Sequence, residues 1–156
     1  MDKNIKLLVM DVDGTLTDGK IYIGAEGEVL KCFNIKDGCG IKNILPYNEI
    51  IPVIITGRVS KSLEVRAKEL GIKELYQGIE DKVGKLQEIL QDYKCTFENV
   101  AYIGDDINDL ECMRECAYTG CPIDAVEEIR QLCQFVSTKK GGEGAVRDFI
   151  EWLIKD

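Results

Sequence analysis

The feature that most constrains the fold is a set of short apolar runs that stop abruptly at polar residues. Three of the four strongest runs do so: Ile5–Met10 before Asp11, Ile50–Ile55 before Thr56, and Val100–Ile103 before Gly104 and Asp105. Continuous apolar runs of this length are typical of strands buried on both faces of a parallel sheet. The carboxyl ends of such strands meet at one edge, where ligands bind. The polar residues at these ends are therefore expected to converge.

Amphipathic segments separate the apolar runs. Helical spacing of apolar residues is found over Gly40–Tyr47, Ser60–Leu70, Asp81–Tyr93, Asn108–Cys116, Ala125–Cys133 and a terminal segment opened by Gly141–Gly144. Strands that alternate with helices predict right-handed crossovers and an α/β fold, with helices on both faces of a parallel sheet. No linker is long enough to separate two domains, so residues 1–156 are expected to form one domain.

A hairpin is expected between the first strand and the first helix. Lys20–Ile23 and Val29–Asn34 flank the glycine-bearing turn Gly24–Gly27, a pattern that predicts two paired antiparallel strands. Leu75-Tyr76 and Ala117–Thr119 are expected to be short strands of the main sheet.

Composition excludes several classes of protein. The chain contains no histidine, which removes serine-histidine hydrolases and histidine-phosphate phosphatases. The formal net charge of −8 argues against nucleic acid or an anionic membrane as a partner, although local lysines and a metal still permit a small anionic substrate. The chemistry must rest on carboxylates, lysine, hydroxyls or a metal.

A cytoplasmic location is expected from three further features. No apolar run approaches the ~20 residues of a membrane-spanning helix, and Met1–Lys6 leads into a strand without a signal peptide. The seven cysteines form no CxxC pair, and no histidine can complete a zinc site with them. They are interpreted as reduced thiols.

The strongest motif is Asp11-Val12-Asp13-Gly14-Thr15. Alternate positions leaving a strand project to the same side, so Asp11 and Asp13 are expected to face one point. Adjacent carboxylates repel unless a cation lies between them, and Mg²⁺ prefers oxygen ligands together with a substrate phosphate. An acidic turn is the alternative. A calcium loop is excluded because the series continues as Leu16-Thr17.

A second acidic motif, Gly104-Asp105-Asp106-Ile107-Asn108-Asp109, follows another strand. Asp105 and Asp109 can reach the same metal, one directly and the other through water or a supporting hydrogen bond. The alternative is a helix cap, since acids are favoured at helix N-termini. That alternative accounts for one or two of the carboxylates more readily than for three.

Two further positions are suited to a phosphate. Thr56 and Gly57 offer a hydroxyl and an amide at the start of a helix, and Lys82 opens another helix, where the dipole disfavours a cation. Taken alone, they are better explained as a strand-to-helix turn and a solvated lysine.

Together these motifs resemble the haloacid dehalogenase superfamily of phosphotransferases. The similarity extends to the 3-deoxy-D-manno-octulosonate 8-phosphate (KDO 8-phosphate) phosphatases and to relatives acting on nine-carbon sialic-type acids. It covers nearly the whole chain and rests on Asp11–Gly19, Phe33–Gly38, Ile55–Arg58, Leu75–Gly78, Lys82, Asn99–Asp106, Asp109 and Gly141–Arg147.

The resemblance implies a role for each motif residue. Asp11 is the nucleophile, which forms a phospho-aspartyl intermediate, and Asp13 is the general acid and base. Mg²⁺ is held by the Asp11 and Asp105 carboxylates and the Asp13 backbone carbonyl, with Asp109 in support. The phosphoryl group is bound by Thr56, Gly57 and Lys82.

The resemblance also implies a Rossmann-like fold without a cap domain and a homotetramer in which a neighbouring subunit closes each site. The apolar hairpin residues Ile21, Tyr22 and Ile23 fit that contact, and packing on the chain's own sheet is the alternative. The implied substrate is a phosphorylated sugar acid. Arg58 favours the eight-carbon acid. Glu143 stands where KDO enzymes often have a basic residue, so the phosphate of a nine-carbon acid is kept as an alternative substrate.

Two other classes are weighed against the phosphatase. An idle relative that assembles with a sugar-acid cytidylyltransferase is expected to have lost Asp11, Asp13 or Lys82, and all three are present. A receiver domain also places an aspartate beside Mg²⁺, but it lacks the Asp-x-Asp-Gly-Thr order and the later Gly-Asp-Asp motif.

Overall fold

The computed structural model describes residues 3–155 and contains a six-stranded sheet in the order β5-β4-β1-β6-β7-β8. Every neighbouring pair is parallel. The strands are β1 (Leu7–Met10), β4 (Ile51–Ile55), β5 (Glu74–Tyr76), β6 (Val100–Ile103), β7 (Tyr118–Cys121) and β8 (Phe135–Val136). The predicted α/β fold with a parallel sheet is confirmed.

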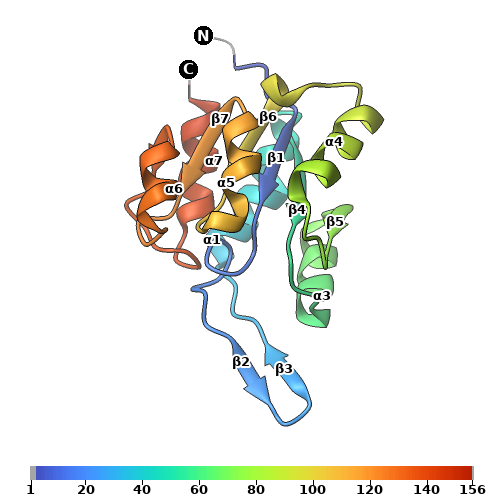
Figure 1. Cartoon of the computed structure of the whole chain (residues 1–156), viewed down its shortest axis with the longest axis vertical. Coiled ribbons are helices and arrows are strands. Elements are labelled where there is room, and N and C mark those ends of the chain that lie inside the picture. Colours follow the sequence, from blue (N-terminus) through green and yellow to red (C-terminus); the bar gives the residue numbers. More distant parts are fainter. Residues whose placement is uncertain (1–2, 156) are drawn as a thin grey trace.

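Helices pack on both faces of this sheet (Figure 1). They are α1 (Ile35–Cys39), α2 (Leu45–Tyr47), α3 (Lys61–Leu70), α4 (Lys82–Asp92), α5 (Ile107–Glu115), α6 (Glu127–Leu132) and α7 (Ala145–Ile154). Helices α4, α5 and α6 pack on one face, and the α1–α2 segment, α3 and α7 pack on the other. The sheet is thus the middle of three layers.

The central strand shows why its sequence is apolar without a break. Successive side chains of a strand point to opposite faces, so Leu8 and Met10 belong to one hydrophobic cluster and Leu7 and Val9 to the other. All four are fully buried. Because both faces of β1 are covered, a polar side chain on either face would be buried at a cost in free energy. The first polar side chain therefore comes after the strand, at its carboxyl end.

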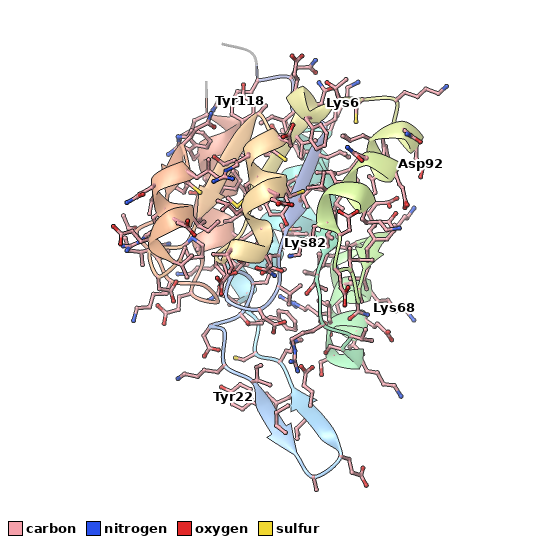
Figure 2. The ribbon with its side chains drawn as sticks, in the orientation of Figure 1. Lys6, Tyr22, Lys68, Lys82, Asp92 and Tyr118 are labelled. Atoms are coloured by element: carbon pink, nitrogen blue, oxygen red, sulfur yellow. The ribbon has the colours of Figure 1, made fainter. Side chains whose placement is uncertain are left out.

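A two-stranded hairpin projects from the body of the molecule between β1 and α1 (Figure 1). Strands β2 (Tyr22–Gly24) and β3 (Gly27–Leu30) pair in antiparallel fashion. Among residues 3–155 this is the whole of the insert between β1 and α1, too small for a cap domain. Large apolar side chains of the hairpin are exposed, including the labelled Tyr22 (Figure 2): Ile21, Tyr22, Ile23, Val29 and Leu30.

Some element boundaries differ from the sequence expectation. The helix expected over Gly40–Tyr47 begins earlier, at Ile35, because the Asn34 side chain accepts a hydrogen bond from the Lys36 amide and caps it. It continues through a π-helical turn at Gly40–Ile44 into α2. Strand β8 was not predicted, since two residues are too short to show a period.

Three residues of the expected domain 1–156, namely Met1, Asp2 and Asp156, lie outside the described residues. The interpretation of Met1–Lys6 as a segment without a signal peptide falls partly on them, and both expectations stay predictions. No helix within residues 3–155 is both long and apolar enough to span a bilayer.

Candidate active site

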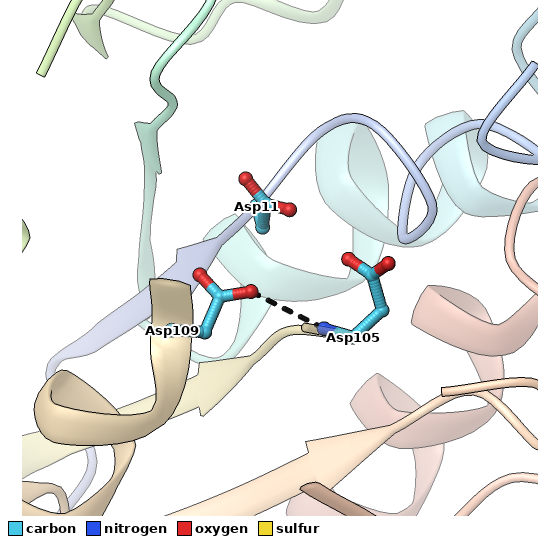
Figure 3. Close-up of side chains that lie close together, drawn as sticks. All are labelled: Asp11, Asp105 and Asp109. Atoms are coloured by element: carbon cyan, nitrogen blue, oxygen red, sulfur yellow. Dashed lines mark hydrogen bonds between the residues drawn. The ribbon is translucent and has the colours of Figure 1, made fainter. Parts of the chain in front are cut away.

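Three carboxylates meet at the carboxyl edge of the sheet (Figure 3). Asp11 follows β1, Asp105 follows β6, and Asp109 lies in the first turn of α5. One oxygen from each lies within 4.8 Å of the other two. Because β1 and β6 are parallel neighbours, their ends place Asp11 and Asp105 together although 93 residues separate them in the chain.

Lys82 reaches into this cluster from the first turn of α4 (Figure 2). Its Nζ lies 2.9 Å from Asp11 Oδ1 and 2.8 Å from Asp109 Oδ1. The residue is 4% exposed, so its charge is paired with carboxylates and not with water. We call the group of Asp11, Asp105, Asp109 and Lys82 the inner cluster.

Asp109 is fully buried, and hydrogen bonds fix both of its oxygens. The Tyr102 hydroxyl donates to Oδ1 at 2.7 Å, and the Asp105 amide donates to Oδ2 at 3.2 Å (Figure 3). The Thr15 hydroxyl in turn donates to Asp105 Oδ1 at 2.9 Å. The sequence reading missed Tyr102 and Thr15. Thr15 lies in the first acidic motif, and Tyr102 lies in the apolar run before the second. The hydroxyl group of each was the feature that could have identified it from the sequence.

The inner cluster has perturbed pKa values because it combines burial with like charges. Burial, followed by the charge of Asp11, raises the pKa of Asp105 to about 8. Burial, together with the charge of Asp109, raises the pKa of Asp11 to about 6 despite the opposing effect of Lys82. Burial lowers the pKa of Lys82, but the charges of Asp11 and Asp109 outweigh it and the net direction is upward.

This arrangement fits a hard divalent cation. When all three carboxylates are ionised, they face one ammonium, which leaves two negative charges uncompensated in a buried site. Oxygen ligands of this kind suit Mg²⁺, and a bound cation would remove the repulsion that raises the carboxylate pKa values.

The Asp13 carboxylate does not join the inner cluster. It points to the hairpin, where Lys31 Nζ lies 2.6 Å from its Oδ1. Asp13 lies in a turn, and Gly14 has a φ of +90°, so the period of two that holds along a strand does not continue beyond Asp11. The structure therefore separates two carboxylates that the sequence pattern placed at one point.

A second set of charges surrounds Asp13, and we call it the outer network. Lys31 also contacts Glu28 at 3.0 Å, and Arg58 lies 3.9 Å from Asp13 and 3.5 Å from Glu28. The Ser60 hydroxyl donates to Glu28. Burial raises the pKa of Glu28, but the Ser60 hydrogen bond and the Lys31 charge outweigh it and lower the pKa overall.

Sequence reasoning missed Lys31, Glu28 and Ser60. The available signal was a lysine within the largely apolar strand expected over Val29–Asn34. Functional residues were expected at strand ends, and the hairpin was expected to contribute only apolar side chains to a subunit contact.

Three candidates for binding the phosphate or the sugar acid, Thr56, Gly57 and Arg58, follow β4 and lie at the same edge of the sheet, since β4 is a parallel neighbour of β1. Thr56 is buried, and its amide donates to the Tyr76 carbonyl at 3.0 Å. Gly57 is exposed, and Arg58 has a half-exposed side chain that reaches the outer network. The backbone is thus fixed at Thr56, whereas Gly57 and Arg58 are accessible to a ligand.

A glycine loop before α7 packs against the turn that follows Asp11. The Gly142 amide donates to the Thr15 carbonyl at 3.2 Å. A Cβ on Gly141 would lie 2.0 Å from the Gly14 carbonyl oxygen, so any side chain there would displace the turn. Glu143 in the same loop is exposed.

Residues 55–150 match the family model for haloacid dehalogenase-like hydrolases. This match covers more than half of the chain and includes the second acidic motif, Lys82 and the phosphate-binding positions. The chain belongs to the haloacid dehalogenase-like hydrolase family.

Within that family, the similar proteins include KDO 8-phosphate phosphatases. The enzyme of Yersinia pestis is 44% identical over 97% of this chain and 80% of its own length. A Moraxella catarrhalis KDO 8-phosphate phosphatase, crystallised with magnesium, phosphate and KDO, is 41% identical with a TM-score of 0.92, covering 97% of this chain and 87% of that one. The cobalt-bound Haemophilus influenzae phosphatase is 35% identical with a TM-score of 0.93, covering 97% and 88%.

Proposed function

We propose that this chain is a Mg²⁺-dependent phosphatase that hydrolyses KDO 8-phosphate through a phosphorylated Asp11. The observation that carries the proposal is the inner cluster, in which three carboxylates and a buried lysine meet at the end of β1. The similarity to KDO 8-phosphate phosphatases over 97% of the chain supports the choice of substrate.

The metal would be held by the Asp11 and Asp105 carboxylates and by the Asp13 backbone carbonyl. Asp109 has both oxygens engaged by neighbouring donors, which fits a supporting position better than a ligand. When bound, the cation would offset negative charge on the phosphoryl oxygens, the main requirement of phosphoryl transfer.

In the first step, an Asp11 carboxylate oxygen attacks phosphorus, and the bond from phosphorus to the sugar oxygen breaks. Asp13 gives its proton to the leaving alkoxide. In the second step, Asp13 takes a proton from water, whose oxygen attacks phosphorus, and the Asp11 carboxylate is released with inorganic phosphate. Lys82, Thr56 and Gly57 hold the phosphoryl oxygens.

Arg58 is the residue proposed to select a sugar acid. Its guanidinium lies beside Asp13 and Glu28, which is the side from which the leaving group departs. An arginine can bind a carboxylate in a bidentate pair. Glu143, exposed in the glycine loop, favours a second candidate, the phosphate of a nine-carbon sugar acid.

Assembly and location belong to the same proposal. Five exposed apolar side chains of the hairpin support a homotetramer in which a neighbouring subunit closes the site, as exposed apolar patches commonly mark interaction surfaces. The seven free cysteines support a cytoplasmic location.

A substrate comparison tests the proposed function. We expect kcat/KM to be highest for KDO 8-phosphate when it is compared with nine-carbon acid 9-phosphates, and excess EDTA to abolish turnover. A preference for a nine-carbon ester would support the second candidate. Undiminished turnover in EDTA would contradict the metal assignment.

A further inference from the structure

The outer network gives the hairpin a place beside the reacting groups. Lys31 directly follows β3, where the hairpin returns to the body of the molecule (Figure 1). Its side chain is 4% exposed, whereas Val29 and Leu30 just before it are exposed. The chain thus buries a cation in a segment that leaves its apolar side chains in solvent.

Stability does not explain this burial. Removing an ammonium and a carboxylate from water is costly, and apolar residues of similar volume often stabilise a fold as well or better. A buried ion pair therefore needs another explanation, and the contacts of Lys31 offer one. Its nearer partner is Asp13, at 2.6 Å, and its other partner is Glu28, at 3.0 Å.

Asp13 has the kind of side chain that needs such a contact. It lies in a turn, and its side chain is about one-fifth exposed, so its direction depends on the polar contacts that it makes. A general acid must come within about 2.6–3.2 Å of the oxygen that it protonates, and productive sites are held to within about 0.5 Å by neighbouring groups. The Lys31 hydrogen bond supplies this restraint, because Arg58 approaches only to 3.9 Å.

Lys31 is itself held from the far side. Glu28 binds its ammonium and is fixed in turn by the Ser60 hydroxyl and by Arg58. Ser60 also caps α3, since its hydroxyl accepts the Leu63 amide. A continuous set of contacts therefore runs from a helix of the body, through Glu28 and Lys31, to the Asp13 carboxylate.

We propose that Lys31 is a positioning residue for Asp13, through which the hairpin sets the orientation of the general acid and base. This proposal deepens the proposed function and rests on it. Lys31 acts through Asp13, so its loss should matter most where the leaving group needs a proton.

The test compares two esters in four variants of the full-length protein: Lys31→Met, Asp13→Asn, the Lys31→Met/Asp13→Asn double variant, and Lys20→Met as a control. KDO leaves from its 8-phosphate as an alkoxide that needs protonation, whereas p-nitrophenolate leaves from p-nitrophenyl phosphate without it. Lys20 is an exposed lysine of the same insert, so Lys20→Met removes an equal charge and leaves the ion pairs of the outer network in place.

We expect Lys31→Met to raise the ratio of kcat/KM for the aryl ester to kcat/KM for the sugar ester at least about tenfold, part of the 10²–10⁴ that general acid catalysis contributes, because kcat/KM reports the step in which the leaving group departs and not the hydrolysis of phospho-Asp11 that both esters share. In the Asp13→Asn background, Lys31→Met should change kcat/KM less than about twofold, because coupled residues are non-additive. Lys20→Met should leave both rates at the wild-type value.

An unchanged ratio, or an equal further loss in the Asp13→Asn background, would overturn the proposal. If Lys31→Met is inactive on both esters, the Glu28→Gln/Lys31→Met variant, which removes both buried charges, is assayed in the same way. Inactivity there on both esters would also overturn the proposal, since Lys31 would then serve the fold. Wild-type protein that hydrolyses neither ester would contradict the proposed function itself.

Discussion

The inner cluster and the outer network are both built from acids and lysine, but they differ in charge balance. In the inner cluster, three carboxylates lie together with a single ammonium, that of Lys82, which contacts Asp11 and Asp109. In the outer network, two carboxylates, Asp13 and Glu28, face two cations, Lys31 and Arg58. The first is short of positive charge and suits a divalent cation, whereas the second is balanced as it stands.

This difference in charge balance indicates that the inner cluster and the outer network serve different parts of the reaction. Uncompensated buried carboxylates raise one another's pKa values, and a cation that relieves them can also offset charge on a transferring phosphate. A set of side chains whose charges balance does not need a bound cation, and it can instead orient an acid and contact the leaving group. We therefore propose that the inner cluster serves the attack on phosphorus and that the outer network serves the leaving group.

Asp11→Asn is expected to have the largest effect. The amide oxygen is a poor nucleophile, so kcat should fall by more than about a thousandfold, as when a nucleophile is removed from other enzymes. The sheet does not depend on this charge, so the melting temperature without metal should stay the same or rise. Residual activity above about one-hundredth of wild type would show that Asp11 is not the nucleophile.

Arg58→Ala tests whether the outer network selects the leaving group. We expect KM for KDO 8-phosphate to rise roughly ten- to a hundredfold, because a charge-assisted hydrogen bond is worth about 1.5–3 kcal/mol. The KM for p-nitrophenyl phosphate, which has no carboxylate, should change little. Steady-state kinetics on both esters measure the split, and equal losses would assign Arg58 to the phosphoryl group or to the fold.

A smaller effect is expected on stability without metal. The pKa of Asp105 is about 8 and that of Asp11 about 6 in the folded chain, against an ordinary value of 3.8. Between these values the folded chain holds protons that the unfolded chain has released, so its free energy of unfolding should fall as pH rises from about 4 to about 8.

Denaturant unfolding in EDTA across this pH range measures the slope, and Asp105→Asn, which cannot ionise at that position, should flatten it. A free energy of unfolding that rises with pH over the same range would contradict the charge imbalance assigned to the inner cluster.

The sequence predicted the inner cluster better than the outer network, for a physical reason. Asp11 and Asp105 follow apolar strands whose parallel pairing can be inferred from pattern, so their meeting follows from topology. The direction of Asp13 depends on the turn at Gly14, and the contact of Lys31 depends on how a hairpin folds back over 18 residues. Neither has a periodic signal.

The same distinction applies to the fold. Buried strands and amphipathic helices were predictable because each repeats a pattern over several turns or residues. The two-residue β8 and the early start of α1 depend on single contacts, such as the cap by Asn34, and these are visible only once the chain is folded.

The most direct test of the account is calorimetric titration with Mg²⁺ of the wild type and two matched carboxylate-to-amide variants, Asp105→Asn in the inner cluster and Glu28→Gln in the outer network. The account predicts that Asp105→Asn weakens Mg²⁺ binding by more than about tenfold, because even the loss of a residue that supports a metal ligand commonly costs that much, and that Glu28→Gln changes it less than about twofold. Wild-type affinity in Asp105→Asn, or an equal loss in Glu28→Gln, would contradict the division between the two sites.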